Sequence, residues 1–195
     1  MGLTEQEQKQ LDLARQGDDA AFFWIVETYQ NLVARTIKGM IGNHQDADDL
    51  GQLVFVRFHK NLSNFRGDSS IGTYLCRIAI NLCKNHIRKM IILRKLGFIS
   101  ESSETEIRGT QANIDLRERM RLALAELPLK AREILVLRYI QGFSMNEIAE
   151  TLNIPLGTVL SRLARAEAKL KTIWLEKAED YSVWKKENPS FSYTF

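Results

Sequence analysis

Two stretches of the chain gather side chains whose types and spacing suit contact with a nucleic acid. The first, residues 69–100, contains no aspartate or glutamate. On a helix, its basic and amide side chains would share one face, in steps of three and four: Arg77, Asn81, Lys84, Asn85 and Arg88. Cations bind phosphates and amides bind base edges, while the rings of Phe65, Tyr74 and His86 could stack on unpaired bases. The alternative is a solvated helix face, and this stretch alone does not decide between the two.

The second stretch, residues 143–163, has the pattern of a helix-turn-helix. Ser144 and Glu147 are spaced as a capping box at the start of a short helix. Asn153 can adopt the left-handed conformation of the turn, and Pro155 suits the first turn of the next helix. That next helix could enter a major groove. Its first N–H groups and its exposed side chains give the candidate DNA contacts Gly157, Thr158, Ser161, Arg162 and Arg165. The alternative is an ordinary helical hairpin with a solvated basic face.

Residues for catalysis or for a metal site do not form a recognised pattern. The sequence has no Walker-type loop, nucleophile elbow or dinucleotide fingerprint, so we expect no enzymatic activity. Asp46, Asp48 and Asp49 could bind a metal or transfer protons, but we find no histidine or second carboxylate cluster to support either role. Helix capping or a basic protein partner is the favoured interpretation. Cys83 and His86 have a spacing that could hold a metal, yet we expect neither a metal nor a cofactor.

Hydrophobic spacing places these candidate residues on helices nearly throughout the chain, and convincing alternating strand patterns are absent. A segment rich in Ser, Thr, Glu and Gly, residues 97–111, is typical of a linker. We therefore predict an all-α fold, with two small helical domains joined by a flexible linker and a helix-turn-helix in the second. The helices expected before the linker cover about residues 4–16, 21–42, 50–62 and 72–93.

Composition agrees with an ordinary folded protein. The chain has 195 residues, of which 45% are hydrophobic and 26% charged, and its formal net charge of +3 names no partner by itself. Cys76 and Cys83 lie seven residues apart on one predicted helix, about 10 Å at the helical rise, so we expect free thiols. The polar first residues lack a signal peptide's apolar core, and no apolar run reaches the roughly 18 residues of a membrane span. We expect a cytoplasmic protein without membrane insertion of its own.

Taken together, the motifs resemble the extracytoplasmic-function (ECF) group of bacterial RNA polymerase sigma factors, in the sigma-70 family. The resemblance covers roughly residues 18–170. Each motif is only modestly specific, but the set in this order is strongly so. The matching segments are 46–55, 65–70, 74–81, Leu127-Pro128 with Glu133, 137–139, 147–149, 157–159 and Ser161-Arg162.

The resemblance implies a subunit that directs core RNA polymerase to specific promoters. Its first domain, residues 1–95, would be like sigma region 2 and would bind the clamp helices of the polymerase β′ subunit. The implied polymerase contacts are Asp46, Asp48, Asp49, Gln52 and Phe55. The same domain would recognise and melt the minus-ten element, and a loop pocket would capture a flipped base. The implied DNA contacts are Arg66, Asp68, Ser69, Tyr74, Arg77, Asn81, Asn85 and Arg88, with Arg66, Asp68, Ser69 and Asn81 at the pocket.

The resemblance also implies the roles of the remaining chain. Residues 96–113 would be a linker that passes near the RNA exit path. Residues 114–175 would be like sigma region 4, dock on the β flap, and place the helix-turn-helix in the minus-thirty-five element. An anti-sigma protein usually holds such factors inactive and is an expected partner. The aromatic tail, residues 176–195, lies largely outside the resemblance.

Some residues depart from the family pattern and leave two other functions open. Gly51 and Leu53 stand where an aliphatic and an acidic residue are common, which weakens the electrostatic basis of the clamp contact. Tyr74 replaces a frequent tryptophan, and Leu160 replaces a frequent arginine that would contact DNA. These departures are the best support for a degenerate decoy that binds a regulator or polymerase and opens no promoter. A stand-alone dimeric regulator is the other alternative, but it leaves the basic face of residues 69–100 unexplained.

Overall fold

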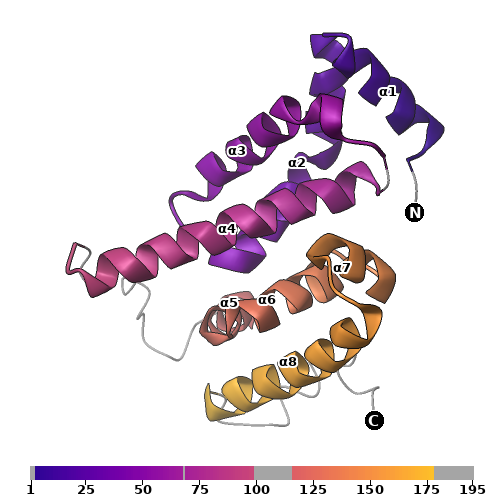
Figure 1. Ribbon diagram of the computed structural model, residues 1–195. Coiled ribbons are helices and arrows are strands. Elements are labelled where there is room, and N and C mark those ends of the chain that lie inside the picture. Colours follow the sequence, from indigo (N-terminus) through magenta and orange to yellow (C-terminus); the bar gives the residue numbers. More distant parts are fainter. Residues whose placement is uncertain (1–2, 68, 99–115, 178–195) are drawn as a thin grey trace.

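The computed structural model describes residues 3–67, 69–98 and 116–177 (Figure 1). Every regular element in these ranges is a helix, which confirms the all-α prediction. Most of the predicted linker and tail, with Asp68, lies outside the described residues. Among the described helices, none combines the length and apolar character needed to cross a membrane.

The first group of helices begins with α1 (Glu5–Arg15), which lies across one end of the others (Figure 1). α2 (Asp19–Ile41) packs against α1, α3 (Ala47–Lys60) and α4 (Ile71–Lys95). A short turn, η1 (Leu62–Asn64), follows α3. Side-chain caps start three of the four long helices, from Thr4, Asp18 and Ser70, because these oxygens accept from backbone N–H groups that lack a helical partner.

The second group starts with α5 (Leu116–Glu126) and α6 (Leu129–Leu135). α6 continues into η4 (Val136–Ile140), where the backbone widens to a π-helix. Gly142 then ends the run with a φ of 72°, as its position in the sequence predicts. The helix-turn-helix follows as α7 (Met145–Leu152) and α8 (Leu156–Lys177).

The two groups pack directly on one another and share one continuous core. α2 contacts α5, α6 and η4. α4 contacts α7, and the two are drawn as neighbours in Figure 1. The approach is close at Gly39, where an added Cβ would lie 2.8 Å from Ile140 Cδ1 and 2.9 Å from Val136 Cγ2. Nearby, the buried Arg132 donates from Nη1 to the carbonyl of Met40 at 2.6 Å. Gln141 Nε2 donates to Thr36 Oγ1 on α2 at 3.0 Å.

Candidate nucleic-acid and polymerase interface

The helix-turn-helix has the local geometry that its sequence predicts. Ser144 Oγ accepts from the Glu147 N–H at 3.3 Å, and the Glu147 carboxylate accepts from the Ser144 N–H at 2.9 Å. These hydrogen bonds to the charged form, first from the Ser144 backbone and then from its hydroxyl, lower the pKa of Glu147. Asn153 has a φ of 52°, in the left-handed region. Val159 and Leu163 are buried, so they orient the opposite face of α8 outward.

The outward face of α8 carries the predicted DNA contacts, but not all of them are equally accessible. Gly157, Ser161 and Arg165 are exposed, and Arg165 Nε donates to the Ser161 carbonyl at 3.0 Å. Thr158 and Arg162 are partly buried. Arg162 Nη1 lies 3.4 Å from the Glu133 carboxylate on α6, an intramolecular ion pair that the sequence did not indicate.

The predicted polar face of α4 divides into an outer and an inner part. Asn81, Asn85 and Arg88 are exposed, and Arg88 Nη1 donates to Asn85 Oδ1 at 3.4 Å. Arg77 and Lys84 are partly buried, because they turn toward the second group of helices. Only the outer part is therefore open to a nucleic acid in this arrangement.

Arg77 and Lys84 each bind a different part of the second group. Arg77 Nε donates to the Thr151 carbonyl at 3.2 Å, and its Nη2 donates to the Glu150 carbonyl. These carbonyls belong to the last turn of α7, the end of a helix that attracts cations. Lys84 Nζ lies 2.8 Å from Glu133 Oε2, as an ion pair without an aligned hydrogen bond. Glu133, whose side chain is 3% exposed, thus sits between a cation of α4 and Arg162 of α8.

The loop before α4 is less accessible than predicted. Phe65 is 5% exposed and packs on Phe58 and Tyr74, with ring centroids 5.8 and 4.9 Å apart. The prediction that Phe65 is available for stacking on a base was therefore wrong, because the ring completes the core between α3 and α4. Tyr74 is partly buried beside it. Of the predicted pocket residues in the loop, Arg66 is exposed and Ser69 is 8% exposed, which leaves Ser69 little surface for a ligand.

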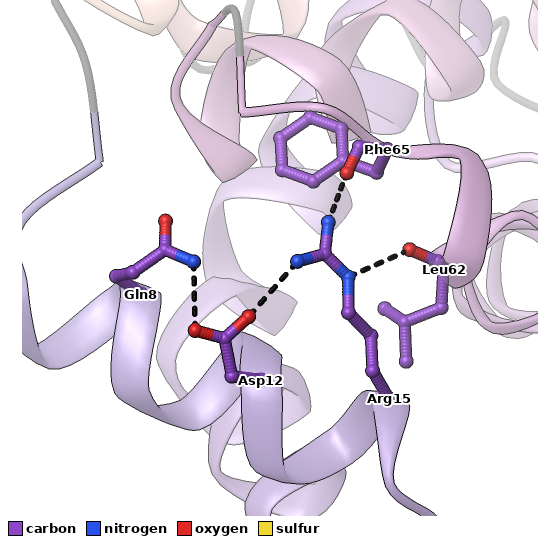
Figure 2. Close-up of polar contacts among 5 residues, drawn as sticks. All are labelled: Gln8, Asp12, Arg15, Leu62 and Phe65. Carbon is purple, nitrogen blue, oxygen red and sulfur yellow. Dashed lines mark hydrogen bonds and ion pairs between the residues drawn. The ribbon is translucent and has the colours of Figure 1, made fainter.

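The side chain of Arg15, at the end of α1, donates hydrogen bonds to backbone carbonyls of this loop (Figure 2). Its Nε donates to the Leu62 carbonyl at 3.2 Å, and its Nη2 donates to the Phe65 carbonyl. Nη1 pairs with Asp12 Oδ1 at 2.9 Å, and Gln8 donates to the other oxygen of Asp12. Sequence reasoning missed Arg15, since its partners lie about 50 residues away and no local pattern marks them.

A shallow groove of about 310 Å³ runs between α2 and α3. Three of the predicted polymerase contacts, Asp48, Gln52 and Phe55, line it. Gly51, at a position where the family commonly has an aliphatic residue, also lines the groove. Because glycine has no side chain, the wall of the groove is open at this point. Asp49 is exposed on α3 and is not among the lining residues.

Comparison with known proteins decides the family. The family model described as Sigma-70 region 2 matches residues 25–90, and the one described as Sigma-70, region 4 matches residues 117–170. The ECF RNA polymerase sigma factor SigW of Bacillus subtilis is 30% identical over 182 residues, covering 84% of this chain and 94% of SigW. This chain belongs to the ECF sigma factors.

Other relatives agree with that assignment. The RNA polymerase sigma-H factor of Pseudomonas aeruginosa is 33% identical to this sigma factor over 174 residues, covering 83% of this chain and 90% of that protein. Among solved structures, CnrH in complex with the cytosolic domain of CnrY matches with a TM-score of 0.67 and 22% identity, over 89% of this chain and 100% of CnrH. RpoE of Bartonella quintana, in complex with the anti-sigma factor NepR, matches with a TM-score of 0.65 and 21% identity, over 82% and 98%. These two structures show the same fold.

Asp46 of this sigma factor lies apart from the groove and faces two histidines. It occupies the N-cap position of α3, but its side chain makes no capping hydrogen bond. Its Oδ2 lies 3.6 Å from His86 Nδ1 and 3.8 Å from His44 Nδ1. The prediction that no histidine accompanies the carboxylates was therefore wrong. The expectation that His86 could stack on a base was also wrong, since its ring packs edge-on against His44.

Proposed function

We propose that this sigma factor binds core RNA polymerase with its first group of helices and reads a promoter with two faces, one on α4 and one on α8. The proposed units are residues 1–95 and 114–175, joined by 96–113 and followed by the tail 176–195. Members of its family direct the polymerase to promoters. This is a step of transcription initiation, and the sigma subunit itself catalyses no reaction in it. The observation that carries the proposal is the pair of exposed polar faces, each on a long helix with a buried apolar side.

The polymerase contact is proposed for the α2–α3 groove. The groove combines an apolar wall at Phe55 with polar groups at Asp48 and Gln52, which suits a helix of the polymerase clamp. Asp49, exposed on α3, would add negative charge near the groove, whereas the carboxylate of Asp46 faces His44 and His86. Leu53, exposed on α3, is the position where an acid is common in the family, so this contact would be more apolar here.

The minus-ten contact is proposed for Asn81, Asn85 and Arg88, together with Arg66 and Asp68 of the loop. Ser69, which is 8% exposed, could join them only if the loop shifts. Amides can bond the edges of unpaired bases, and the two arginines can neutralise phosphates. Tyr74 supports the loop through its packing on Phe65. The minus-thirty-five contact is proposed for the outward face of α8, from Gly157 to Arg165.

Two of the proposed DNA contacts must first release intramolecular partners. Arg77 is bonded to the end of α7, and Arg162 is paired with Glu133. Arg77 could reach a phosphate only after α4 and α7 separate or shift. Arg162 would have to leave Glu133, which belongs to its own group of helices. We therefore infer that the arrangement in Figure 1 is a closed form, and that binding of polymerase and promoter draws the two groups apart.

An anti-sigma protein is the further proposed partner. RpoE of Bartonella quintana was solved with the anti-sigma factor NepR, and it has the same fold as this chain. We place the action of the sigma factor in the cytoplasm, with core polymerase and chromosomal DNA, and we propose no enzymatic activity for it.

The test of the polymerase contact is co-elution of the purified chain with core RNA polymerase at moderate salt. The parent should co-elute at one copy per polymerase, and Gln52→Arg should weaken this because a bulky cation would fill the groove. Gln16→Arg, at an exposed glutamine beyond α1, adds the same charge and should co-elute like the parent. Failure of the folded parent to bind would contradict the proposal, and tight binding to a palindromic duplex without polymerase would favour a stand-alone regulator.

A further inference from the structure

His44, Asp46 and His86 form a cluster that the proposed polymerase and promoter contacts do not explain. One ligand-type atom from each residue lies within 4.8 Å of the other two. His44 and Asp46 belong to the turn that leads into α3, whereas His86 lies on α4. Packing of α3 on α4 therefore brings together residues separated by about 40 positions in the sequence.

The distances are close to those of a metal site. A tetrahedral Zn²⁺ site with bonds of about 2.0–2.1 Å places neighbouring ligand atoms about 3.3 Å apart. Asp46 Oδ2 is 3.6 Å from His86 Nδ1 and 3.8 Å from His44 Nδ1, so shifts of a few tenths of an ångström would suffice on these two edges. The two imidazoles meet edge-on, with ring centroids 4.9 Å apart.

The ring of His44 is oriented toward Asp46. His44 Nδ1 accepts the Asp46 N–H at 3.2 Å, so its lone pair already points toward Asp46. An ion bound at Nδ1 would replace that one hydrogen bond.

The two histidines of the cluster are more buried than its aspartate. Those of His44 and His86 are 17% and 12% exposed, whereas that of Asp46 is 40% exposed. An ion could therefore enter from the side of Asp46, and water could complete its coordination. Lys89 is close enough to help lower the pKa of His86, but it is exposed and can direct its ammonium group into solvent.

We propose that His44, Asp46 and His86 bind one divalent transition-metal ion of the Zn²⁺ type. Two imidazoles and one carboxylate form a ligand set that suits Zn²⁺, whereas Mg²⁺ and Ca²⁺ favour oxygen ligands alone. A bound ion would join the start of α3 to the middle of α4 and stabilise the first group of helices. The inference does not depend on the proposed polymerase or promoter contacts.

The experiment titrates the full chain with Co²⁺ alone and follows visible absorption, which is strong for four-coordinate Co²⁺ and weak for the aqueous ion. Zn²⁺ is then added as a competitor and measured by calorimetry. We expect one equivalent to bind. His44→Ala and His86→Ala should weaken binding by more than about tenfold, since losing even a partner behind a ligand costs 10–100-fold.

His59 provides the matched control, because its exposed imidazole packs on Phe22 and lies outside the cluster. His59→Ala should bind the ion like the parent. Asp46→Asn keeps the shape of the ligand and guards against misfolding of His86→Ala, and circular dichroism checks each fold. Zn²⁺ should raise the melting temperature of the parent and of His59→Ala, but not that of the three cluster variants.

The proposal would be overturned if the folded parent gave no Co²⁺ absorption at millimolar concentration. Equal binding by His44→Ala, His86→Ala and the parent would also overturn it, as would loss of binding in His59→Ala. Displacement of the bound ion by equimolar Mg²⁺ would contradict nitrogen coordination.

Discussion

The ion pair between Lys84 on α4 and Glu133 on α6 offers a sharp test of how the closed form is held together. Its charged atoms lie 2.8 Å apart, and the side chains are 22% and 3% exposed. At an effective dielectric constant of about 20, Coulomb's law gives roughly 6 kcal/mol of attraction at that distance. Desolvation of the buried carboxylate offsets much of it, so we expect Lys84→Met to cost the closed form about 1–3 kcal/mol.

That loss should appear as a change in the balance between closed and open forms. A cost of 1–3 kcal/mol lowers the closed-to-open ratio about 5- to 150-fold. Glu133 keeps Arg162 as a partner at 3.4 Å, so the second group of helices should remain folded in the variant. Lys130→Met, at an exposed lysine on the same helix as Glu133, removes the same charge and should leave the balance unchanged.

The assay is energy transfer between dyes on cysteines introduced at the exposed positions Lys60 on α3 and Lys169 on α8. The native Cys76 and Cys83 are buried and should escape labelling. Lys84→Met should lower the transfer efficiency, while circular dichroism stays unchanged. Unchanged efficiency in Lys84→Met, with both groups folded, would refute the role of this ion pair in closure.

Three further outcomes follow from the structure. The pKa of Glu147 is lowered by its bonds to Ser144, so the stability it contributes is present above the ordinary value of 4.5 and is lost as pH falls below it. The free energy of unfolding, measured in urea, should therefore fall less steeply between pH 6 and 3 in Glu147→Gln than in the parent, and equal slopes would contradict this. Ser144→Ala should lower that free energy by about 1 kcal/mol at pH 7. Burial raises the pKa of Cys76 and Cys83 to about 12, so a thiol reagent at pH 8 should modify both only after unfolding, and rapid reaction of the native chain would contradict their burial. Arg15→Ala should impair promoter opening more than co-elution with polymerase, because it frees the loop before α4, and an equal loss in both assays would indicate general misfolding.

Features that depend on neighbours in sequence could be predicted. The capping box at Ser144 and Glu147, the left-handed Asn153 and the stop at Gly142 each follow from side chains or backbone preferences within a few residues. The apolar stripe of α4 could also be predicted, since helical spacing alone brings Leu75 and Ala79 to one side. The order of motifs then indicated the family.

Features that depend on distant packing could not be predicted. Arg77 and Lys84 fit the helical spacing of a nucleic-acid face, but their partners at Thr151 and Glu133 lie in the other group of helices. Phe65 carries a ring suited to stacking, yet the core between α3 and α4 takes it up. In each case, the residue type was informative and its surroundings were set by tertiary contacts.

The same reason explains why the sequence did not indicate the cluster of His44, Asp46 and His86. The sequence suggested Cys83 with His86 because they are three residues apart. In the structure, Cys83 is fully buried and His86 meets His44 and Asp46 instead. Proximity across two packed helices is not visible in a single sequence.

The most direct test of the proposed promoter contacts is permanganate reactivity of unpaired thymines in a promoter bound by the reconstituted holoenzyme. The parent should open the promoter, and Asn81→Ala should reduce the reactivity while co-eluting normally with core polymerase. Asn43→Ala, at an exposed asparagine in the turn after α2, should open the promoter like the parent. Full reactivity with Asn81→Ala would contradict the role assigned to the outer face of α4.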